Sequence, residues 1–451
     1  MKTSADVVIC GAGIAGISAA FYLARRGVRD ILLVDEGAPL ELTSSQSTEC
    51  YRNWWPDPQM LALMNRSIDL LEQLATESGN VFGLNRRGYV YVTAEETRIP
   101  ALMERALQIS RLGAGPLRRH TYEHSTYEPS EPEGYKGAPA GADLLVGSQL
   151  LQRHFPGLAG QALAALHVRR AGWLSAQQLG MYLLESARRA GVRFVSSRVM
   201  SLELSKGRVS GVRLSKDGTV STRTFINAAG PYLRDVGKLA NVDLPVQTEL
   251  HLKAAFNDVL GVIDRAAPLL IWDDPQSLPW EEDERSALAD DPATRWLTGP
   301  FPPGAHTRPE GGAGSRMALM LWEYTAKPME AVWPPPLDPL YPEVALRGLA
   351  TMLPGLRAYF GHAPRPILDG GYYTKTAENR PLVGPMGVDG AYMIGALSGF
   401  GIMSACGVGD LLAAHLTTDA LPAYAPSFTL TRYSDPAYVR DLGKLGDGGQ
   451  L

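Results

Sequence analysis

The first 34 residues show two different periods of hydrophobic positions. Val7–Cys10 is a continuous apolar run typical of a buried parallel strand, and residues 14–26 follow with apolar and small residues at helical spacing. A second apolar run at 31–34 predicts the next strand. The order strand, helix, strand predicts one unit of a parallel sheet whose connecting helix packs on it.

Later segments continue to mix the two periods. The further predicted elements are strands at 88–93, 193–204, 208–214 and 224–230, and helices at 95–112 and 175–190. Residues 113–141 are rich in Gly, Pro, Glu and Tyr and predict irregular structure. Residues 269–314, which include the acidic run 281–284, predict a surface excursion from the main fold.

Composition restricts the class of protein. The 451 residues are 45% hydrophobic and 20% charged, which indicates a globular protein of two or three packed units. A net charge of -4 argues against nucleic-acid binding. Three widely spaced cysteines predict neither a disulfide framework nor a metal site, and they favour a reducing cytoplasm. The sequence does not indicate an oligomeric state.

The beginning of the chain predicts no export signal and no membrane span. Residues 1–6 carry no basic region or small-residue cleavage site. The apolar stretch 7–24 is interrupted by three glycines where a strand must turn into a helix. We therefore expect a protein of the cytoplasm.

A glycine motif stands between the first predicted strand and helix. Gly11 permits a tight turn, Gly13 lets a pyrophosphate approach the backbone, and Gly16 lets the helix pack on the strand. Asp35 ends the second strand, where a carboxylate can bind ribose hydroxyls, and Glu36 is a weaker alternative. The backbone expected at the pyrophosphate belongs to Gly11, Gly13, Ile14, Ala15 and Gly16. The motif predicts a dinucleotide and does not choose between NAD and FAD.

Separated segments farther along the chain carry a family resemblance. They are the Ser/Thr-rich segment 43–48, residues 197–199, residues 227–232, and the C-terminal pair 379–385 and 395–403. With the glycine motif, they resemble the D-amino-acid oxidase superfamily of FAD oxidoreductases, and within it the branch of monomeric sarcosine oxidase and dimethylglycine dehydrogenase. The C-terminal segment closes the flavin site in that family, so the resemblance implies FAD.

The resemblance also implies an architecture. The expected class is α/β (α+β overall), with a Rossmann-type FAD-binding domain assembled from discontinuous segments and an inserted antiparallel-sheet substrate domain. The FAD-binding segments would be 1–86, 167–246 and 365–438, the substrate segments 87–166 and 247–364, and the tail 439–451. The further FAD-binding residues that it implies are Ser44, Ser45, Ser47, Thr48, Val199, Ala229, Gly230, Arg380, Gly399, Phe400, Gly401, Ile402 and Met403.

Covalent attachment of the flavin is not expected. Gly371 stands where sarcosine oxidase-like proteins carry the tethering cysteine, and no histidine precedes His120 to act as an N-terminal tether. Cys406 lies on a predicted helix and is interpreted as a packed core thiol. The resemblance therefore implies non-covalent FAD.

Candidate substrate residues come from the same resemblance. Arg52 lies where the family binds a substrate carboxylate, and Tyr373 lies where it places an aromatic ring beside the substrate. The lysine that activates oxygen aligns with Arg316, and Lys253 is a candidate replacement. The family's second carboxylate-binding lysine is replaced by Ile402, so the way in which the substrate is held stays open.

The expected function is an FAD-dependent oxidoreductase. It would remove a hydride from the C–H next to the nitrogen of a small secondary or tertiary amine or an amino acid. The resulting imine would hydrolyse, and O2, forming H2O2, or another acceptor would reoxidise the flavin. Two alternatives stay open, a flavin dehydrogenase of 2-hydroxy acids and an FAD-binding subunit or assembly factor of a larger complex. No Ser/His/Asp or metal-ligand spacing favours a hydrolase or a metalloenzyme.

Overall fold

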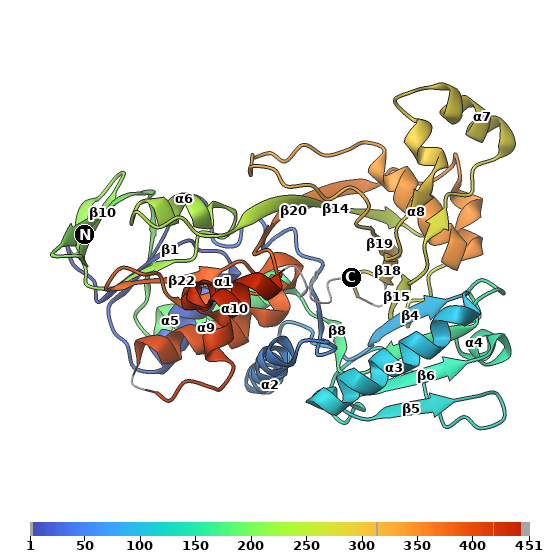
Figure 1. The fold of residues 1–451 in the computed structure, drawn as a ribbon, viewed down its shortest axis with the longest axis horizontal. Coiled ribbons are helices and arrows are strands. Elements are labelled where there is room, and N and C mark those ends of the chain that lie inside the picture. The colour runs from blue at the N-terminus through green and yellow to red at the C-terminus, as the bar shows by residue number, and fades with distance from the viewer. Residues whose placement is uncertain (1–2, 313, 418, 443–451) are drawn as a thin grey trace.

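Two large sheets organise the protein. The computed structural model describes residues 3–312, 314–417 and 419–442. The expected tail, 439–451, lies outside the described residues from position 443 onward. Figure 1 shows one part of the chain on the left and a second on the right, joined along the top by two long strands. The mixed α/β class is confirmed.

The first sheet contains six strands and includes the predicted N-terminal unit. Its strands, in spatial order, are β21 (Leu382–Pro385), β22 (Ala391–Gly395), β13 (Phe225–Asn227), β1 (Val7–Cys10), β2 (Ile31–Asp35) and β9 (Arg193–Ser196). All neighbours are parallel except β21 and β22. Such strands are buried on both faces, which explains their continuous apolar runs. A smaller antiparallel sheet is formed by β10 (Val199–Ser205), β11 (Arg208–Leu214) and β12 (Gly218–Ser221).

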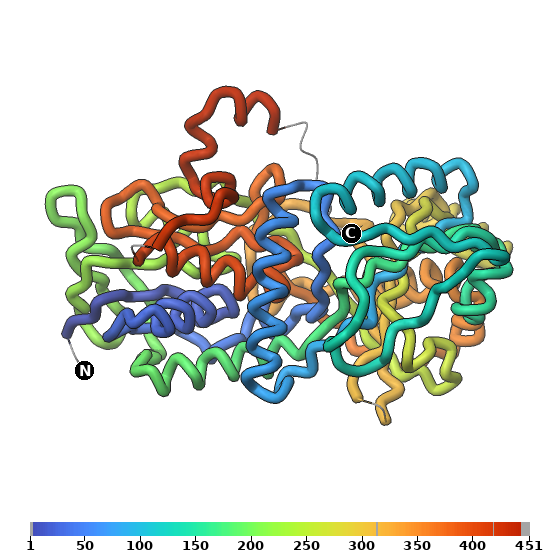
Figure 2. The backbone as a smooth tube through the Cα atoms, turned by 90° about the horizontal axis from the view of Figure 1, so that it is seen from below, coloured from blue at the N-terminus to red at the C-terminus, as the bar shows by residue number. Residues whose placement is uncertain are grey.

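Helices from distant segments cover the six-stranded sheet. They include α1 (Ile14–Arg25), α5 (Ala176–Arg189), α6 (Leu233–Lys238) and α9 (Gly401–Leu416). Ser175 caps α5 through a side-chain oxygen that accepts from the Gln178 backbone N–H, as the sequence predicts. Helix α1 packs against both α5 and α9, and α2 (Pro58–Ser78) packs on the other side of α9. Figure 2 shows α2, in blue, crossing the middle of the molecule.

Among the described residues, one segment is long and apolar enough to cross a membrane by length and composition. It is Ser398–Leu416, which contains α9, and 72% of its apolar window is buried inside the structure. Its glycines fit this burial, because a Cβ on Gly409 would lie 2.2 Å from the Ser18 Oγ of α1. The apolar character of α9 is explained by packing between α1 and α2.

The second sheet contains nine strands. In spatial order they are β20 (Ile367–Lys375), β14 (Gln247–Asn257), β19 (Met317–Leu321), β18 (Ala305–Pro309), β15 (Leu269–Trp272), β4 (Tyr89–Thr93), β7 (Ala164–Val168), β6 (Ala142–Val146) and β5 (Leu117–His120). The sheet is mixed and not purely antiparallel, because β4 with β15 and β5 with β6 are parallel pairs. Helices α3 (Ile99–Ile109), α4 (Ser148–His154) and α8 (Tyr341–Met352) belong to this part of the chain.

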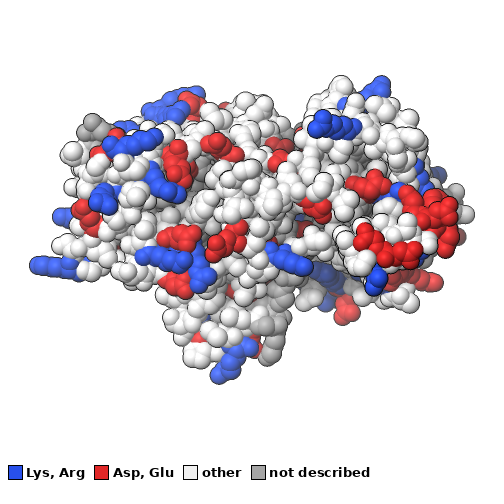
Figure 3. Space-filling model, turned by 90° about the horizontal axis from the view of Figure 1, so that it is seen from above, with Lys and Arg blue, Asp and Glu red and all other residues white. Residues whose placement is uncertain are grey.

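The nine-stranded sheet changes two expectations. Strand β20 pairs with β14 throughout its length, although the predicted division gives residues 365–438 to the FAD-binding domain. The expectation that all of 269–314 is an excursion is wrong, because β15 and β18 are internal strands of the sheet. Only its middle part, with α7 (Glu282–Asp290), is an exposed excursion. Figure 3 shows acidic side chains gathered at the end of the molecule where α7 lies.

Candidate active site

The glycine turn after β1 is packed too closely for side chains. Gly11 has φ +110°, and a Cβ built on it would lie 2.3 Å from the carbonyl oxygen of Ala228. A Cβ on Gly16 would lie 1.8 Å from the carbonyl oxygen of Gly11. Gly13 is less confined, with Ser44 Oγ 3.3 Å from such a Cβ. The turn therefore brings backbone without side chains to the carboxyl end of β1, in the middle of the six-stranded sheet.

The N-terminus of α1 is arranged to receive an anion. Gly13 supplies no side-chain cap, and the first turn contains no acidic residue. The Ile14 backbone N–H donates to Ser44 Oγ at 3.0 Å, which fixes the following segment against the turn. Unsatisfied N–H groups and the helix dipole make this end of a helix favourable for a phosphate.

A cavity of about 640 Å³ opens over this turn. The lining residues that the sequence predicts are Gly11, Gly13, Ile14, Ala15, Asp35, Glu36, Ser44, Val199, Ala229, Gly230 and Gly401. The carboxylate of Asp35 accepts from the backbone N–H groups of Ala12 (2.7 Å) and Gly37 (2.9 Å), which holds it at the end of β2. Glu36 lies 3.3 Å from Arg198 at the exposed rim. The residues present fit an adenine dinucleotide, whose diphosphate the glycine turn would hold.

Three predicted cofactor residues line neither this cavity nor the smaller chamber that adjoins it. Gly16 acts through its packing against Gly11. The Ser45 hydroxyl donates to the carbonyl of Glu41 at 2.7 Å, so it closes a local turn. Arg380 donates through Nε to Asp57 Oδ2 at 2.7 Å, at the N-terminus of α2. This ion pair fastens the 379–385 segment to a helix, and the expected contact of Arg380 with FAD stays a prediction.

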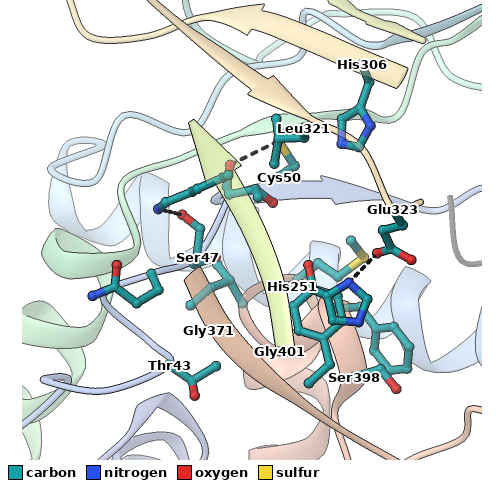
Figure 4. A pocket seen from close by; sticks show the side chains of 18 of the residues that line it. Thr43, Ser47, Cys50, His251, His306, Leu321, Glu323, Gly371, Ser398 and Gly401 are labelled. Atoms are coloured by element: carbon teal, nitrogen blue, oxygen red, sulfur yellow. Dashed lines mark hydrogen bonds and ion pairs between the residues drawn. The ribbon is translucent and has the colours of Figure 1, made fainter. Parts of the chain in front are cut away.

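A smaller inner chamber of about 130 Å³ adjoins the first cavity (Figure 4). The two share the lining residues Ile14, Thr43, Ser44, Ser398 and Gly401. Further predicted residues that line the inner chamber are Ser47, Thr48, Arg52, Lys253, Gly399, Phe400, Ile402, Met403 and Tyr373. A ligand that extends from the glycine turn past Ser44 would therefore reach the inner chamber with its far end.

Arg52 enters the chamber from β3 (Cys50–Arg52), which pairs with β8 (Ala171–Trp173). The arginine is buried, and its guanidinium carbon lies 4.7 Å from the centre of the Trp55 ring and 5.7 Å from that of Tyr89. Aromatic faces stabilise a cation by a moderate amount when water is excluded. The guanidinium can form paired hydrogen bonds with a carboxylate in this chamber.

The two candidates for oxygen activation lie in different places. Lys253 lines the chamber, where its Nζ donates to the Ser47 carbonyl at 3.1 Å and lies 3.8 Å from Asp369. Burial lowers the pKa of Lys253, although the negative charge of Asp369 acts in the opposite direction. Arg316 is exposed in the turn before β19 and donates to the Val259 carbonyl at 3.2 Å. Arg316 therefore lies outside the chamber, and the expectation that it stands in the place of the oxygen-activating lysine is wrong.

A cluster of charged groups lies on β14 and its neighbours. The sequence offered His251 only as a histidine that could influence amine protonation, with a structural role as the alternative, and it did not assign Glu249, Glu323 or Lys375 to the site. His251 Nδ1 is 3.0 Å from Glu323, and its Nε2 is 3.3 Å from Glu249. Glu249 is also 3.2 Å from Lys375 Nζ. The ring of Tyr373 stacks on His251 with the centroids 3.7 Å apart. Glu249, His251 and Lys253 share one face of β14 because side chains alternate along a strand, and this alternation was the available signal.

Electrostatics in this cluster favour an ionised histidine. Burial lowers the pKa of His251, but hydrogen bonds to Glu249 and Glu323 outweigh it and raise the pKa above the ordinary value. The hydrogen bond with His251, followed by the charge of Lys375, holds the pKa of Glu249 down at about 2. Burial raises the pKa of Tyr373 well above its usual range. The phenol is therefore neutral at ordinary pH.

The positions of the cysteines bear on how a flavin could be attached, which stays a prediction. Gly371 lines the inner chamber, and Cys406 is buried in α9. Cys50 lines the inner chamber, which sequence reasoning did not anticipate, and burial raises the pKa of its thiol. Among the described residues, no group of three or more His, Cys, Asp or Glu side chains could hold a metal ion.

The discontinuous dinucleotide fold and its adjoining chamber define a flavin-dependent oxidoreductase. The family described as "FAD dependent oxidoreductase" (DAO) matches residues 6–415, and the chain belongs to this family. The family is FAD dependent, which confirms the expected cofactor.

Known proteins resemble this chain to different degrees. Mitochondrial dimethylglycine dehydrogenase of Homo sapiens is 24% identical over 319 residues, which cover 67% of this chain and 33% of that protein. The chain thus spans about a third of the length of that relative. The solved L-proline dehydrogenase from P. horikoshii matches with a TM-score of 0.74 and 16% identity, and glycine oxidase from Geobacillus kaustophilus with 0.72 and 17%. Each match covers 96% of this chain and 99% of the other. These two solved structures have the same fold as this chain.

Proposed function

We propose that the protein oxidises a small amino acid or a secondary or tertiary amine that carries a carboxylate. It removes a hydride from the C–H next to nitrogen, and water hydrolyses the resulting imine. The buried Arg52 in a small chamber that adjoins the dinucleotide cavity carries this proposal. The relatives named dimethylglycine dehydrogenase, L-proline dehydrogenase and glycine oxidase support the substrate class.

The residues of the chain have distinct roles in this reaction. FAD, when bound, supplies the hydride acceptor. Arg52 binds the carboxylate and thereby orients the substrate, while Trp55, Tyr89 and Phe400 exclude water from the chamber. Tyr373 forms the wall on which the substrate rests. Fixing the reacting carbon in this way lowers the entropic part of the barrier.

The experiment is an anaerobic reduction screen of the purified yellow protein. Glycine, proline, N-methylglycine and N,N-dimethylglycine are compared with lactate and 2-hydroxybutyrate, and bleaching of the flavin absorbance is recorded. Amines should bleach the flavin and hydroxy acids should not. Bleaching by hydroxy acids alone would show a hydroxy-acid dehydrogenase. Bound FAD that no compound reduces, with stable capture of another protein, would show a subunit of a larger complex.

The electron acceptor is tested on the reduced protein. Reoxidation is followed after mixing with O2 and, separately, with a soluble quinone or dye. We propose O2, with H2O2 as the product, because Lys253 places a cation in the chamber. Faster reoxidation by the quinone or dye, without H2O2, would show a dehydrogenase.

A further inference from the structure

The inner chamber is lined by a carboxylate as well as by cations. Glu323 is the one carboxylate among the described residues that line the chamber, and 29% of its side chain is accessible. Arg52 and Lys253 line the chamber as cations, together with the ring of His251, which Glu323 contacts. The chamber thus presents opposite charges, which suits a ligand that carries both signs.

The sheet register places Glu323 in the chamber. Lys253 of β14 faces Leu321 of β19 in an antiparallel pair, so a continuation of the register sets residue 323 opposite residue 251. The backbone pairing itself ends at Leu321, but the His251 Nδ1 to Glu323 Oε1 distance of 3.0 Å shows that the two side chains still meet just past the end of β19. In Figure 4 the two side chains point toward each other, with the interaction drawn between them.

His251 is held so that it can fix Glu323. Its other ring nitrogen is bonded to Glu249, which Lys375 neutralises. The Tyr373 ring covers its face at an interplanar angle of 14°. An imidazole that donates from both nitrogens to two carboxylates is an imidazolium, and it leaves Glu323 ionised. The imidazole is therefore fixed in position and orients the carboxylate beside the space for the substrate.

We propose that Glu323 binds the nitrogen of the substrate while Arg52 binds its carboxylate, and that His251 positions Glu323. The inference rests on the proposed function and narrows its substrate class to zwitterions with a protonated amine. A 2-hydroxy acid offers no positive charge to this carboxylate. Before oxidation the N–H bond breaks, an O–H bond forms on Glu323, and nitrogen keeps the electron pair that assists hydride departure.

Charged and titratable groups from several strands surround the pair. They are Glu249, His251 and Lys253 on β14, Tyr373 and Lys375 on β20, His306 on β18, Tyr341 on α8 and Arg52 on β3. Burial lowers the pKa of His306, so this second imidazole is neutral. Of the cations that line the chamber, Arg52 lies against aromatic rings, Lys253 donates to the Ser47 carbonyl, and His251 is held between Glu249 and Glu323. Glu323 supplies the lining carboxylate, and a carboxylate attracts a positively charged nitrogen.

The test compares two ligands that differ by one atom. N,N-dimethylglycine and 3-methylbutanoate have the same branched shape and the same carboxylate, but only the first has a protonated nitrogen. Their Kd values are measured anaerobically by stopped flow on the holoprotein, from the change in flavin absorbance that precedes any reduction. The wild-type protein should bind dimethylglycine more tightly.

The variant Glu323→Gln should remove this preference. Its affinity for dimethylglycine should fall about 10- to 100-fold, because a hydrogen bond between charged groups is lost. Its affinity for 3-methylbutanoate should stay within about twofold of wild type, since that ligand never used the charge. Glu330→Gln removes an exposed acid on the following segment and should leave both affinities unchanged. If Glu323→Gln does not fold, Glu323→Asp keeps the charge and should keep the preference.

The outcomes separate this inference from the proposed function. Equal weakening of both ligands in Glu323→Gln, or a preference that survives in it, overturns the role of Glu323. If amines still reduce the flavin in that case, the proposed function stands alone. If no amine reduces the wild-type flavin and neither ligand binds, the proposed function fails and this inference fails with it.

Discussion

His251 lies face to face with Tyr373, with ring centroids 3.7 Å apart. The contact joins β14 to β20, and β20 also carries Gly371 into the inner chamber. Both strands belong to the nine-stranded sheet, whereas the glycine turn that opens the outer cavity belongs to the six-stranded sheet. The chamber is therefore closed by side chains from one sheet over a cofactor cavity built on the other. A substrate held there contacts both parts of the fold.

Arg52 tests the carboxylate end of the chamber. Arg52→Lys keeps the charge but loses the planar fork that forms two parallel hydrogen bonds. We expect the Kd for 3-methylbutanoate to rise about 10- to 100-fold. The measurement is a flavin absorbance titration, with the melting temperature as a check on folding. Arg213→Lys, on an exposed position of β11, should bind like wild type, and an unchanged Kd in Arg52→Lys would remove Arg52 from the site.

Gly13 tests the cradle for the diphosphate. A Cβ there would meet only Ser44 Oγ at 3.3 Å, so Gly13→Ala should fold, yet the added methyl group lies where the backbone faces the cofactor. We expect FAD affinity to fall on the order of tenfold. Reconstitution of the apoprotein, followed by flavin fluorescence, measures the Kd. Gly160→Ala, which places its Cβ in open space, is the matched control, and equal affinity in the two variants would refute the prediction.

Local patterns account for what the sequence predicted well. The strand, glycine turn and helix at 7–25 are specified by residues within one short segment, as is the Ser175 cap of α5. A buried parallel strand needs a continuous apolar run, and a close backbone approach needs glycine. These requirements can be read without knowledge of distant residues, and the structure confirms them.

Long-range pairings account for what the sequence missed. The His251 and Glu323 contact depends on the register of β14 with β19, across more than sixty residues of intervening chain. The ion pair of Arg380 with Asp57 joins residues more than three hundred positions apart. Arg316 was placed by an alignment through glycines, but the strand begins only at Met317. Neither periodicity nor motif spacing reports such partners.

Lys253 tests the reaction of the reduced protein with oxygen. Lys253→Met removes the chamber cation that faces Ser47 while keeping the length of the side chain. We expect reoxidation by O2 to slow on the order of tenfold, because charge that develops during oxygen reduction loses its stabilising cation. Reduction by an amine under anaerobic conditions is the internal control and should change little. Slower reduction with unchanged reoxidation would assign Lys253 to substrate binding.

The flavin should leave the protein on acid denaturation. Gly371 offers no thiol in the inner chamber, and Cys406 is buried in the α9 packing. Precipitation with trichloroacetic acid should therefore release the yellow colour into the supernatant, where chromatography identifies FAD. Colour that stays in the pellet would contradict this expectation. Cys50→Ser would then show whether the thiol in the inner chamber is the attachment point.

The charge on His251 predicts a pH-dependent contribution to stability. Its pKa in the folded protein is raised above the ordinary 6.5, so the folded state holds the proton more tightly than the unfolded state. The stabilisation is complete below about pH 6.5 and is lost as the pH rises through the folded pKa. Glu249, with its pKa at about 2, stays ionised over this range. The melting temperature of His251→Gln should therefore fall furthest below wild type near pH 6 and approach it near pH 9.

The control for this pH dependence is His362→Gln, because His362 is exposed. That variant should follow the wild-type melting temperature at every pH, since substitutions of exposed side chains change stability little. Differential scanning fluorimetry of the holoproteins at saturating FAD measures the three curves, so that loss of cofactor does not enter the comparison. A deficit in His251→Gln that is constant, or that grows with pH, would mean that the imidazole is neutral in the folded protein. One of the two carboxyl groups, Glu249 or Glu323, would then have to carry the proton for its hydrogen bond with the neutral ring. The ionised state inferred for Glu323 would lose its support.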